Sequence, residues 1–403
     1  MKKNLNGILV WFLVTLFVVY AFFLNTAGAV FADTIKAFLN ASDVEASLAV
    51  SSFIIGFAFM QIPGGYLLDR YNIRYVVSGG IFLLALGNLT LSFSNSLFLF
   101  SLSNFIQGLG ASFAFVAVGK VISQWFRPNL FPILFGLTQT ISCFAAAFIH
   151  YMLVQALKTI TWQTIYQELA VFGFITFAAI LLIVRSPANI KVVASSKQLS
   201  LKDSLALAFS NGQLWLCAFA SATAFGTLMA YASFWYIRVE QFYSVSSSDA
   251  LIISGMIFAG IGIGTPFLGW LSNRLKSRNL VIHLSLAIGN IFLLMCLYAP
   301  HFDLNSLIPI KIISFFAGFF LSGSMLYYTC VSELSKDNTR AINLSVVNTA
   351  VFLFNSLLLF IPYFFITKDS QSFFTYLWVL PSCVMVSMLL IYFVKETYKE
   401  SKA

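Results

Sequence analysis

The chain has 403 residues, of which 60% are hydrophobic, 9% are charged and 45 are Phe. A water-soluble protein of this length needs roughly a quarter charged residues, so the composition excludes a soluble chain. The net charge is +9, but the cations form no run that would suggest nucleic acid, and we expect them to set membrane topology. The five Cys lie singly in apolar segments, which fits neither a disulfide framework nor a zinc site.

Apolar segments long enough to cross a bilayer, which takes about 20 residues of helix, recur along the whole chain. The first, at 8–31, is too long for the apolar core of a signal peptide. We predict twelve membrane helices, near 8–31, 46–68, 74–93, 97–122, 130–154, 168–185, 211–237, 248–272, 279–299, 305–333, 339–365 and 372–394.

Lys and Arg are divided unequally between the two sides that twelve helices define. Both termini and the even-numbered connections hold 18 of the 23 cations, whereas the odd-numbered connections hold 5. The positive-inside rule therefore predicts that both termini are cytoplasmic.

The longest connection, 186–210, lies in the middle of the chain. Its residues Ser200 to Asp203 match a capping box, so we predict a short helix on the cytoplasmic membrane surface. The predicted organisation is a six-helix bundle at 1–185, this linker at 186–210 and a second six-helix bundle at 211–403.

A ten-residue pattern occurs twice. Residues 65–74 (GYLLDRYNIR) follow the second predicted helix, and residues 269–278 (GWLSNRLKSR) follow the eighth. Both copies have Gly at the first position and Arg at the sixth and tenth positions. Equivalent loops after equivalent helices predict two parallel six-helix repeats around an axis normal to the membrane.

The first loop resembles the signature loop of the major facilitator superfamily, Gly-x-x-x-Asp-Arg-x-Gly-Arg-Arg/Lys. Asn72 stands where Gly is usual, and Asn tolerates a left-handed backbone better than most residues. The segments 60–65 and 136–140 are similar to those of bacterial metabolite importers of the family. The matching positions of the loop are Gly65, Asp69, Arg70 and Arg74.

This resemblance implies an all-α membrane protein of two pseudo-symmetric six-helix bundles. It also implies a multi-pass protein of the bacterial cytoplasmic (inner) membrane that works as a monomer, with the first, fourth, seventh and tenth helices lining its cavity.

The signature loop predicts a gate at the cytoplasmic side. Gly65 allows another helix to approach closely, and Asp69 can accept hydrogen bonds from the N-terminus of a neighbouring helix. Arginines of the loop can hold that carboxylate by charge-assisted bonds, although they would also serve as topology anchors alone. The second copy has Asn273 in place of the acid and would close less tightly. The predicted gating residues are Gly65, Asp69, Arg70, Arg74, Arg127 and Arg274.

Polar residues deep in the predicted helices are candidates for substrate binding, because a bilayer tolerates them only against water or a partner. Lys120 would present a cation to a carboxylate, or it would reach the cytoplasmic headgroups. Gln139 and Asn348 can donate and accept together, which suits a zwitterion, a sugar or a hydroxy acid; alternatively they bond to neighbouring helices. The other candidates are Tyr20, Asn25, Tyr231, Arg238 and Tyr327.

These features predict a secondary transporter that imports a small polar, carboxylate-bearing metabolite, such as an organic acid, an amino acid or a carboxylate siderophore. Protons are the candidate coupling ion, although no acid lies centrally in the first or fourth helix. The alternatives are a multidrug or metabolite exporter of the same fold and a non-transporting receptor, which would need larger soluble segments.

No phosphate-cradling, zinc-protease or catalytic-triad motif is present in the sequence. We therefore predict no enzymatic activity, no cofactor and no metal. The expected partners are a small-molecule substrate and membrane lipid, and not nucleic acid.

Overall fold

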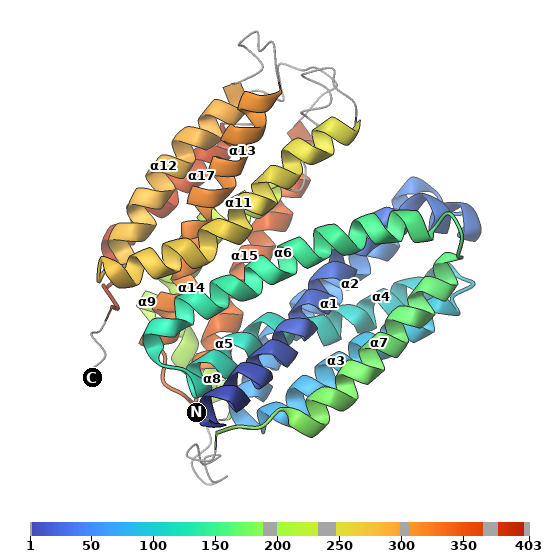
Figure 1. Cartoon of the computed structure of the whole chain (residues 1–403), viewed down its shortest axis with the longest axis horizontal. Helices are drawn as coiled ribbons and strands as arrows, with labels where there is room; N and C mark the ends of the chain where they lie inside the picture. Colours follow the sequence, from blue (N-terminus) through green and yellow to red (C-terminus); the bar gives the residue numbers. More distant parts are fainter. Residues whose placement is uncertain (1, 188–199, 233–246, 299–306, 366–377, 399–403) are drawn as a thin grey trace. The chain divides into compact units, whose positions relative to one another are not determined.

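The computed structural model describes residues 2–187, 200–232, 247–298, 307–365 and 378–398, which are almost entirely helical and contain no strand (Figure 1). The first helices are α1 (Lys2–Leu39), α2 (Asp43–Arg70), α3 (Ile73–Ser92), α4 (Leu97–Ala111), α5 (Ala114–Trp125), α6 (Phe131–Ala156), α7 (Trp162–Ile183) and α8 (Leu201–Phe209). They are followed by α9 (Gly212–Ser221), α11 (Ser247–Arg274), α12 (Arg278–Tyr298), α13 (Ile308–Leu321), α14 (Leu326–Leu334), α15 (Arg340–Phe365) and α17 (Val379–Leu390).

Each of the twelve predicted membrane segments contains a helix. Within the described residues, ten helical stretches are long and apolar enough to cross a membrane. The helix α6 covers the predicted fifth segment, and α17 with the short η6 (Ile391–Phe393) covers the described part of the twelfth.

Three of these stretches are not regular α-helices throughout. The fourth is divided between α4 and α5. A π-turn, η3 (Ala222–Gly226), continues α9, and a 3₁₀ turn, η5 (Ser322–Met325), joins α13 to α14. Such turns inside helices frequently lie at functional sites.

Side-chain caps fix several helix starts. Asn72 has a φ of −61°, and its side chain accepts the Arg74 amide at 3.0 Å; it therefore caps α3 instead of adopting a left-handed turn. The Ser200 hydroxyl accepts the Asp203 amide at 3.1 Å and donates to the Asp203 carboxylate at 2.7 Å, at the start of α8. The location of α8 on a membrane surface stays a prediction.

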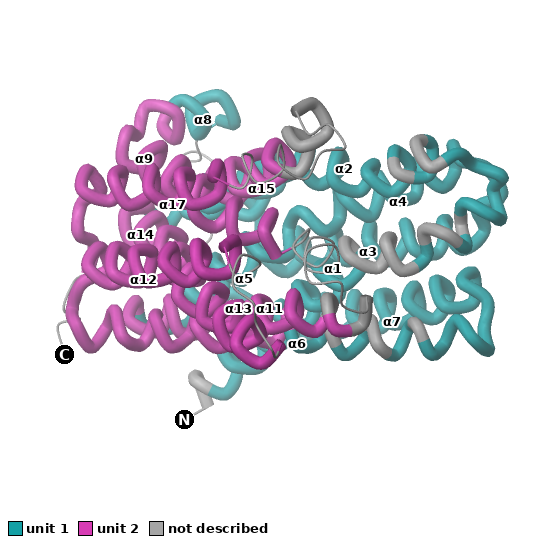
Figure 2. Tube along the Cα trace, turned by 90° about the horizontal axis from the view of Figure 1, so that it is seen from above, with its two compact units in different colours: residues 1–127, 144–206, 336–345 teal, residues 128–143, 207–335, 346–403 magenta. Residues whose placement is uncertain are grey.

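The chain forms two compact units (Figure 2). Unit 1 comprises residues 1–127, 144–206 and 336–345, and unit 2 comprises residues 128–143, 207–335 and 346–403. The first turns of α15 thus belong to unit 1, and the first half of α6 belongs to unit 2. The division of the chain at 186–210 into bundles 1–185 and 211–403 stays a prediction.

The same helix pairs pack together within each unit. In unit 1, α2 and α3 pack on α4, α3 also packs on α7, and α1 packs on α5 and α7. In unit 2, α11 and α12 pack on α13, α12 also packs on α17, and α9 packs on α14 and α17. This repetition agrees with the repeated loop in the sequence.

Glycines allow the closest helix pairs to touch through their backbones. A Cβ atom on Gly108 of α4 would overlap the Phe53 carbonyl oxygen of α2. Similarly, a Cβ atom on Gly318 of α13 would overlap the Ile257 carbonyl oxygen of α11. Small residues at such crossings are typical of helix association in membranes.

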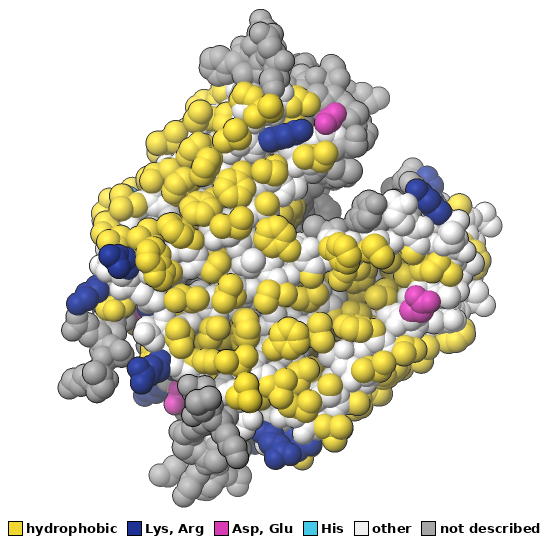
Figure 3. Space-filling view, in the orientation of Figure 1, with side chains coloured by type: hydrophobic (Ala, Val, Ile, Leu, Met, Phe, Trp, Pro, Cys, Tyr) yellow, Lys and Arg dark blue, Asp and Glu magenta, His cyan; other side chains and the backbone are white. Residues whose placement is uncertain are grey.

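Many large apolar side chains are exposed, and the face seen in Figure 3 is largely apolar, with few charged side chains, which lie mainly near its edges. Phe59, Phe98 and Ile175, for example, are 70%, 77% and 64% exposed. A surface of this kind fits contact with lipid and not with water.

We expect Gly108→Ala to destabilise the protein, since its methyl group meets a backbone atom that can move only with α2; overpacking of this kind costs about 1–3 kcal/mol. Gly79→Ala is the matched control, because nothing lies within 4 Å of its Cβ position. Thermal unfolding of the purified protein measures the difference. Equal midpoints for both variants would contradict the close α2–α4 packing.

Candidate functional site

The carboxylate of Asp69, near the end of α2, lies at the N-terminus of α15. One oxygen accepts the Ala341 amide at 3.1 Å, and the other accepts the Ile342 amide at 2.9 Å. These are among the first amides of a helix, which have no acceptor within the helix itself and carry the positive end of its dipole. The helix terminus therefore stabilises the ionised carboxylate.

Lys120 of α5 completes this arrangement. Its ammonium group forms an ion pair with Asp69 and also donates to the Asp337 carbonyl oxygen, just before α15. Both side chains of the pair are only 5% exposed. Lys120 therefore does not extend to the surface, and its charge is balanced by Asp69.

Gly65 makes this approach possible. A Cβ atom on Gly65 would overlap the Ser345 hydroxyl and lie 2.9 Å from the Ala341 carbonyl oxygen. Because Gly65 precedes Asp69 by one helical turn, the two residues contact the same first turns of α15. We call Gly65, Asp69, Lys120 and residues 337–345 the α15 latch; all belong to unit 1.

The predicted gating arginines make other contacts. Arg70 donates to the Tyr66 hydroxyl, with its guanidinium carbon 5.7 Å from the centre of that ring. Arg74 donates through Nε to the Leu181 carbonyl oxygen at the end of α7. Arg127 is exposed, and Arg274 is exposed with its guanidinium 5.9 Å from the Trp270 ring. Their roles in gating stay predictions.

The repeated loop of unit 2 contacts the start of α6. Asn273, at the position equivalent to Asp69, donates to the Asn129 carbonyl oxygen at 2.7 Å. Gly269, at the position equivalent to Gly65, would bring a Cβ atom within 2.9 Å of the Pro132 backbone. Each unit thus holds its loop against the first residues of another helix, but in unit 2 the contact carries no charge.

A buried ion pair also occurs in unit 2. Arg278 is 1% exposed and binds Glu333 of α14 at 2.8 Å. It also donates to Ser272 at 2.6 Å and to Asn273 at 2.8 Å. Unit 2 therefore pairs a loop cation with an acid of its tenth span, whereas unit 1 pairs a loop acid with a cation of its fourth span.

Residues near the C-terminus bind the same loop. Glu396 accepts the Arg278 and Asn279 amides at 3.0 and 3.1 Å, and so caps α12. Burial would raise the pKa of Glu396, but the Ser277 hydroxyl and these backbone donors lower it below the ordinary value of 4.5. Thr397 donates to Glu333 at 2.6 Å, which links the segment to the buried ion pair.

The amides predicted to contact substrate both lie in unit 2. Asn348 of α15 is 3% exposed, and its oxygen accepts the Tyr328 hydroxyl at 2.9 Å. The Tyr328 ring lies 5.4 Å from that of Phe135, one turn before Gln139 on α6. Gln139 donates to Cys143 Sγ at 3.3 Å. The amide nitrogen of Asn348 is buried and has no hydrogen-bond partner among the residues that the structure describes.

The predicted tyrosines have hydrogen-bond partners or burial of their own. The Tyr20 hydroxyl, in unit 1, donates to the Leu169 carbonyl oxygen at 2.6 Å and accepts from Asn88. The Tyr327 hydroxyl contacts Ser387 Oγ at 3.1 Å, and Tyr231 is fully buried. The side chain of Asn25 and the whole of Arg238 lie outside the described residues.

The sequence predicted helix amides as partners of Asp69, but it identified neither which helix supplies them nor the partners of Lys120. The Asp337 carbonyl and the amides of Ala341 and Ile342 carry no side-chain signal at all. One sequence signal was available, because Lys120 precedes Arg127 by the same seven residues that separate Glu333 from Arg340. In each buried ion pair, one partner lies in a predicted membrane helix: Lys120 in unit 1 and Glu333 in unit 2.

The sequence model of the Major Facilitator Superfamily matches residues 12–359 of the chain. The chain belongs to the major facilitator superfamily. Together with the all-helical fold, this confirms the predicted family and the all-α membrane fold class, and the chain is a multi-pass membrane protein.

Solved structures of this superfamily have the same fold. The fucose:proton symporter FucP of E. coli has a TM-score of 0.72 and 17% identity, with 98% of this chain and 100% of FucP covered. The proton:xylose symporter XylE has a TM-score of 0.70 and 15% identity, with 97% of this chain and 96% of XylE covered. At these identities the likeness establishes the fold alone.

Relatives with similar sequences include a multidrug resistance protein and an uncharacterized transporter. The multidrug resistance protein MdtL of Shigella dysenteriae is 25% identical over 175 residues, which are 42% of this chain and 44% of MdtL. The uncharacterized transporter YybO of Bacillus subtilis is 28% identical over 112 residues, 28% of this chain and 26% of YybO. The chain therefore spans less than half the length of these relatives.

We expect Asp69→Asn and Lys120→Gln each to destabilise this protein, because breaking one side of a buried ion pair costs about 3–5 kcal/mol. The double variant should lose less than the sum, with a coupling of about 0.5–3 kcal/mol. A double-mutant cycle by thermal unfolding measures this. The partly exposed pair of Lys311 and Asp249, 4.0 Å apart, is the control and should show weak coupling. Additive losses at Asp69 and Lys120 would refute a shared network.

Glu396→Gln should lower stability at neutral pH, because the variant keeps one acceptor oxygen and loses the charge that caps α12. The lowered pKa of Glu396 means that its charged form stabilises the fold above the ordinary carboxyl pKa. That stabilisation is lost as the pH falls through the lowered value. Thermal midpoints of wild type and variant should therefore converge in acid, and a constant difference at all pH values would contradict the capping role.

Proposed function

We propose that this chain is a secondary transporter that moves a small polar metabolite by alternating access, with the α15 latch as its cytoplasmic gate. The supporting observation is the buried carboxylate of Asp69, which is shared between Lys120 and the first amides of α15. Such charge interactions are strong where water is excluded and weaken many-fold when water enters. The latch would therefore be either closed and dry or open and hydrated, as a gate requires.

The substrate site that we propose lies around Asn348, Tyr328 and Gln139 of unit 2. The unpaired amide nitrogen of Asn348 is a buried donor, and leaving such a group unsatisfied costs about 1–3 kcal/mol. A substrate hydroxyl or carboxylate oxygen would satisfy it, and the ring of Phe135 supplies an apolar wall. This combination of one apolar wall and a few convergent polar groups suits a sugar, a zwitterion or a hydroxy acid.

The sequence suggested a carboxylate-bearing substrate because of the positive charge of Lys120, and the structure calls for a different argument. Asp69 balances that charge in the latch. Carboxylate-bearing metabolites stay in the proposal because the amide of Asn348 can donate to them. Import and proton coupling also stay proposals, the first supported by the resemblance of residues 60–65 to those of metabolite importers.

Multidrug efflux is the second candidate function. The similarity to MdtL over 175 residues favours it. The two candidates differ in the expected substrate, since an exporter of lipophilic compounds needs a broad apolar site, whereas metabolite transport needs convergent hydrogen-bonding groups.

Counterflow into proteoliposomes preloaded with sugars, amino acids, organic acids, nucleosides or lipophilic dyes distinguishes the candidates. We expect exchange of one polar class and none of the dyes. Exchange of dyes alone would replace the proposal with efflux. If every polar compound failed with protein that remained folded, metabolite transport would be abandoned.

With the exchanged compound known, Asn348→Ala should raise KM about tenfold, the effect of losing one hydrogen bond of roughly 1.4 kcal/mol. Asn290→Ala is the matched control, because Asn290 is also a buried Asn of unit 2 but donates to the Pro381 carbonyl oxygen of α17. Initial uptake rates measure both variants. An equal KM for wild type and Asn348→Ala would remove Asn348 from the site.

A further inference from the structure

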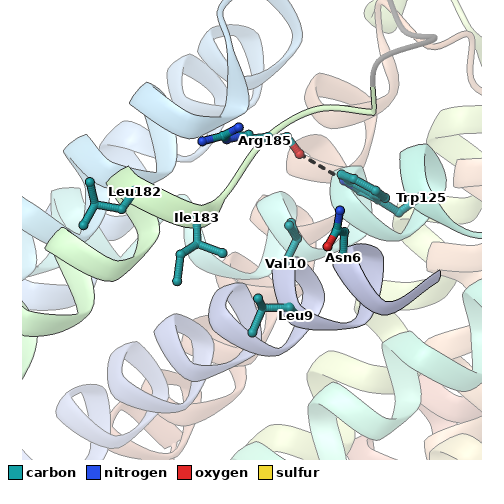
Figure 4. Close-up of a pocket in the computed structure, with 7 residues that line it drawn as sticks. All are labelled: Asn6, Leu9, Val10, Trp125, Leu182, Ile183 and Arg185. Carbon is teal, nitrogen blue, oxygen red and sulfur yellow. Dashed lines mark hydrogen bonds between the residues drawn. The ribbon is translucent and has the colours of Figure 1, made fainter. Parts of the chain in front are cut away.

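A crevice of about 300 Å³ lies in unit 1, near the start of α1 and the ends of α5 and α7 (Figure 4). The positive-inside pattern assigns these helix ends to the cytoplasmic side. One wall is apolar and consists of Leu9, Leu182 and Ile183, which are 43%, 65% and 38% exposed. In a membrane helix, such side chains face lipid.

The mouth of the crevice is polar. Asn6, Trp125 and Arg185 line it, and Figure 4 shows Arg185 extending over the end of α7 while Asn6 points towards Trp125. The indole nitrogen of Trp125 donates to the Arg185 carbonyl oxygen at 3.1 Å, which holds the backbone of Arg185 at the rim. Gly7 lets this ring lie against α1, because a Cβ atom there would be 3.1 Å from it.

Two cations of the described residues, Arg185 and Arg74, lie near the crevice. Among the described residues, neither Arg185 nor Arg74 forms an ion pair with a carboxylate. Arg74 is held beside the apolar wall, since its Nε donates to the Leu181 carbonyl oxygen. Basic residues with no acidic partner, next to an apolar slot at the cytoplasmic headgroup level, complement an anionic headgroup with its acyl chains.

We propose that this crevice binds an anionic phospholipid of the cytoplasmic leaflet. Its phosphate contacts Arg185 and Asn6, and an acyl chain follows the wall of Leu9, Leu182 and Ile183. The site tightens the contact of α1 with the ends of α5 and α7, and it is independent of the transported substrate.

Fluorescence quenching by brominated acyl chains tests this proposal, because it reports lipid next to a tryptophan. The full chain is reconstituted in nanodiscs with brominated phosphatidylglycerol or brominated phosphatidylcholine. The fluorescence of Trp125 is obtained by subtracting the emission of Trp125→Phe from the emission of the wild type. We expect phosphatidylglycerol to quench Trp125 preferentially. Arg185→Gln should reduce this preference about fivefold, the effect of one cation near a membrane surface. Lys202→Gln, an exposed cation of α8, should leave it unchanged.

Equal quenching by the two lipids, or an unchanged preference in Arg185→Gln, would overturn the proposal. Glycerol phosphate is the competitor that lacks acyl chains. If it displaced brominated phosphatidylglycerol as effectively as unbrominated phosphatidylglycerol does, the crevice would bind phosphate and not lipid, and the proposal would again be overturned. Asn6→Asp gives an independent test, because it places an isosteric negative charge at the mouth. Native mass spectrometry should then retain several-fold less phosphatidylglycerol, and undiminished retention would refute the site.

Discussion

The buried contact of Asp69 with Lys120 and the N-terminus of α15 is the constraint on which the rest of the site depends. A carboxylate that is 5% exposed is stable only while its charge and both oxygens are satisfied. Residues 337–345 supply two amide donors to Asp69 and a carbonyl acceptor to Lys120. The first turns of α15 must therefore stay against α2 as long as the carboxylate is buried, and Gly65 is the residue that leaves room for them.

Unit 2 meets the same requirement with the charges exchanged. Its loop contact through Asn273 is neutral, and its buried ion pair joins Arg278 to Glu333. Glu396 and Thr397 reinforce that pair with hydrogen bonds to the same loop. Of the two repeated loops, the one that makes a charged contact with a neighbouring helix start is thus the loop of Asp69, and in the proposed cycle water entry weakens that contact most. This asymmetry follows from one substitution between the repeats, Asp in one loop and Asn in the other.

Much of the fold could be predicted from the sequence, because a bilayer requires helices of a fixed length and the repeated loop marks equivalent positions. The loop also predicted that Asp69 would need helix amides. The cation on that carboxylate could not be predicted, since Lys120 is 51 residues from Asp69 and its carbonyl partner is 217 residues away. Tyr328, the partner of Asn348, was missed for a related reason: among many aromatic residues, nothing in the sequence distinguishes the one that donates to an amide.

The most direct test of the gate is the accessibility of Ser345, which is fully buried against Gly65. Ser345→Cys, in a background without the five native cysteines, is labelled with a membrane-impermeant maleimide in inside-out vesicles. The account predicts slow labelling with Asp69 present and labelling at least about tenfold faster with Asp69→Asn, the change that roughly 1.4 kcal/mol produces. Equal labelling rates in the two backgrounds would contradict it.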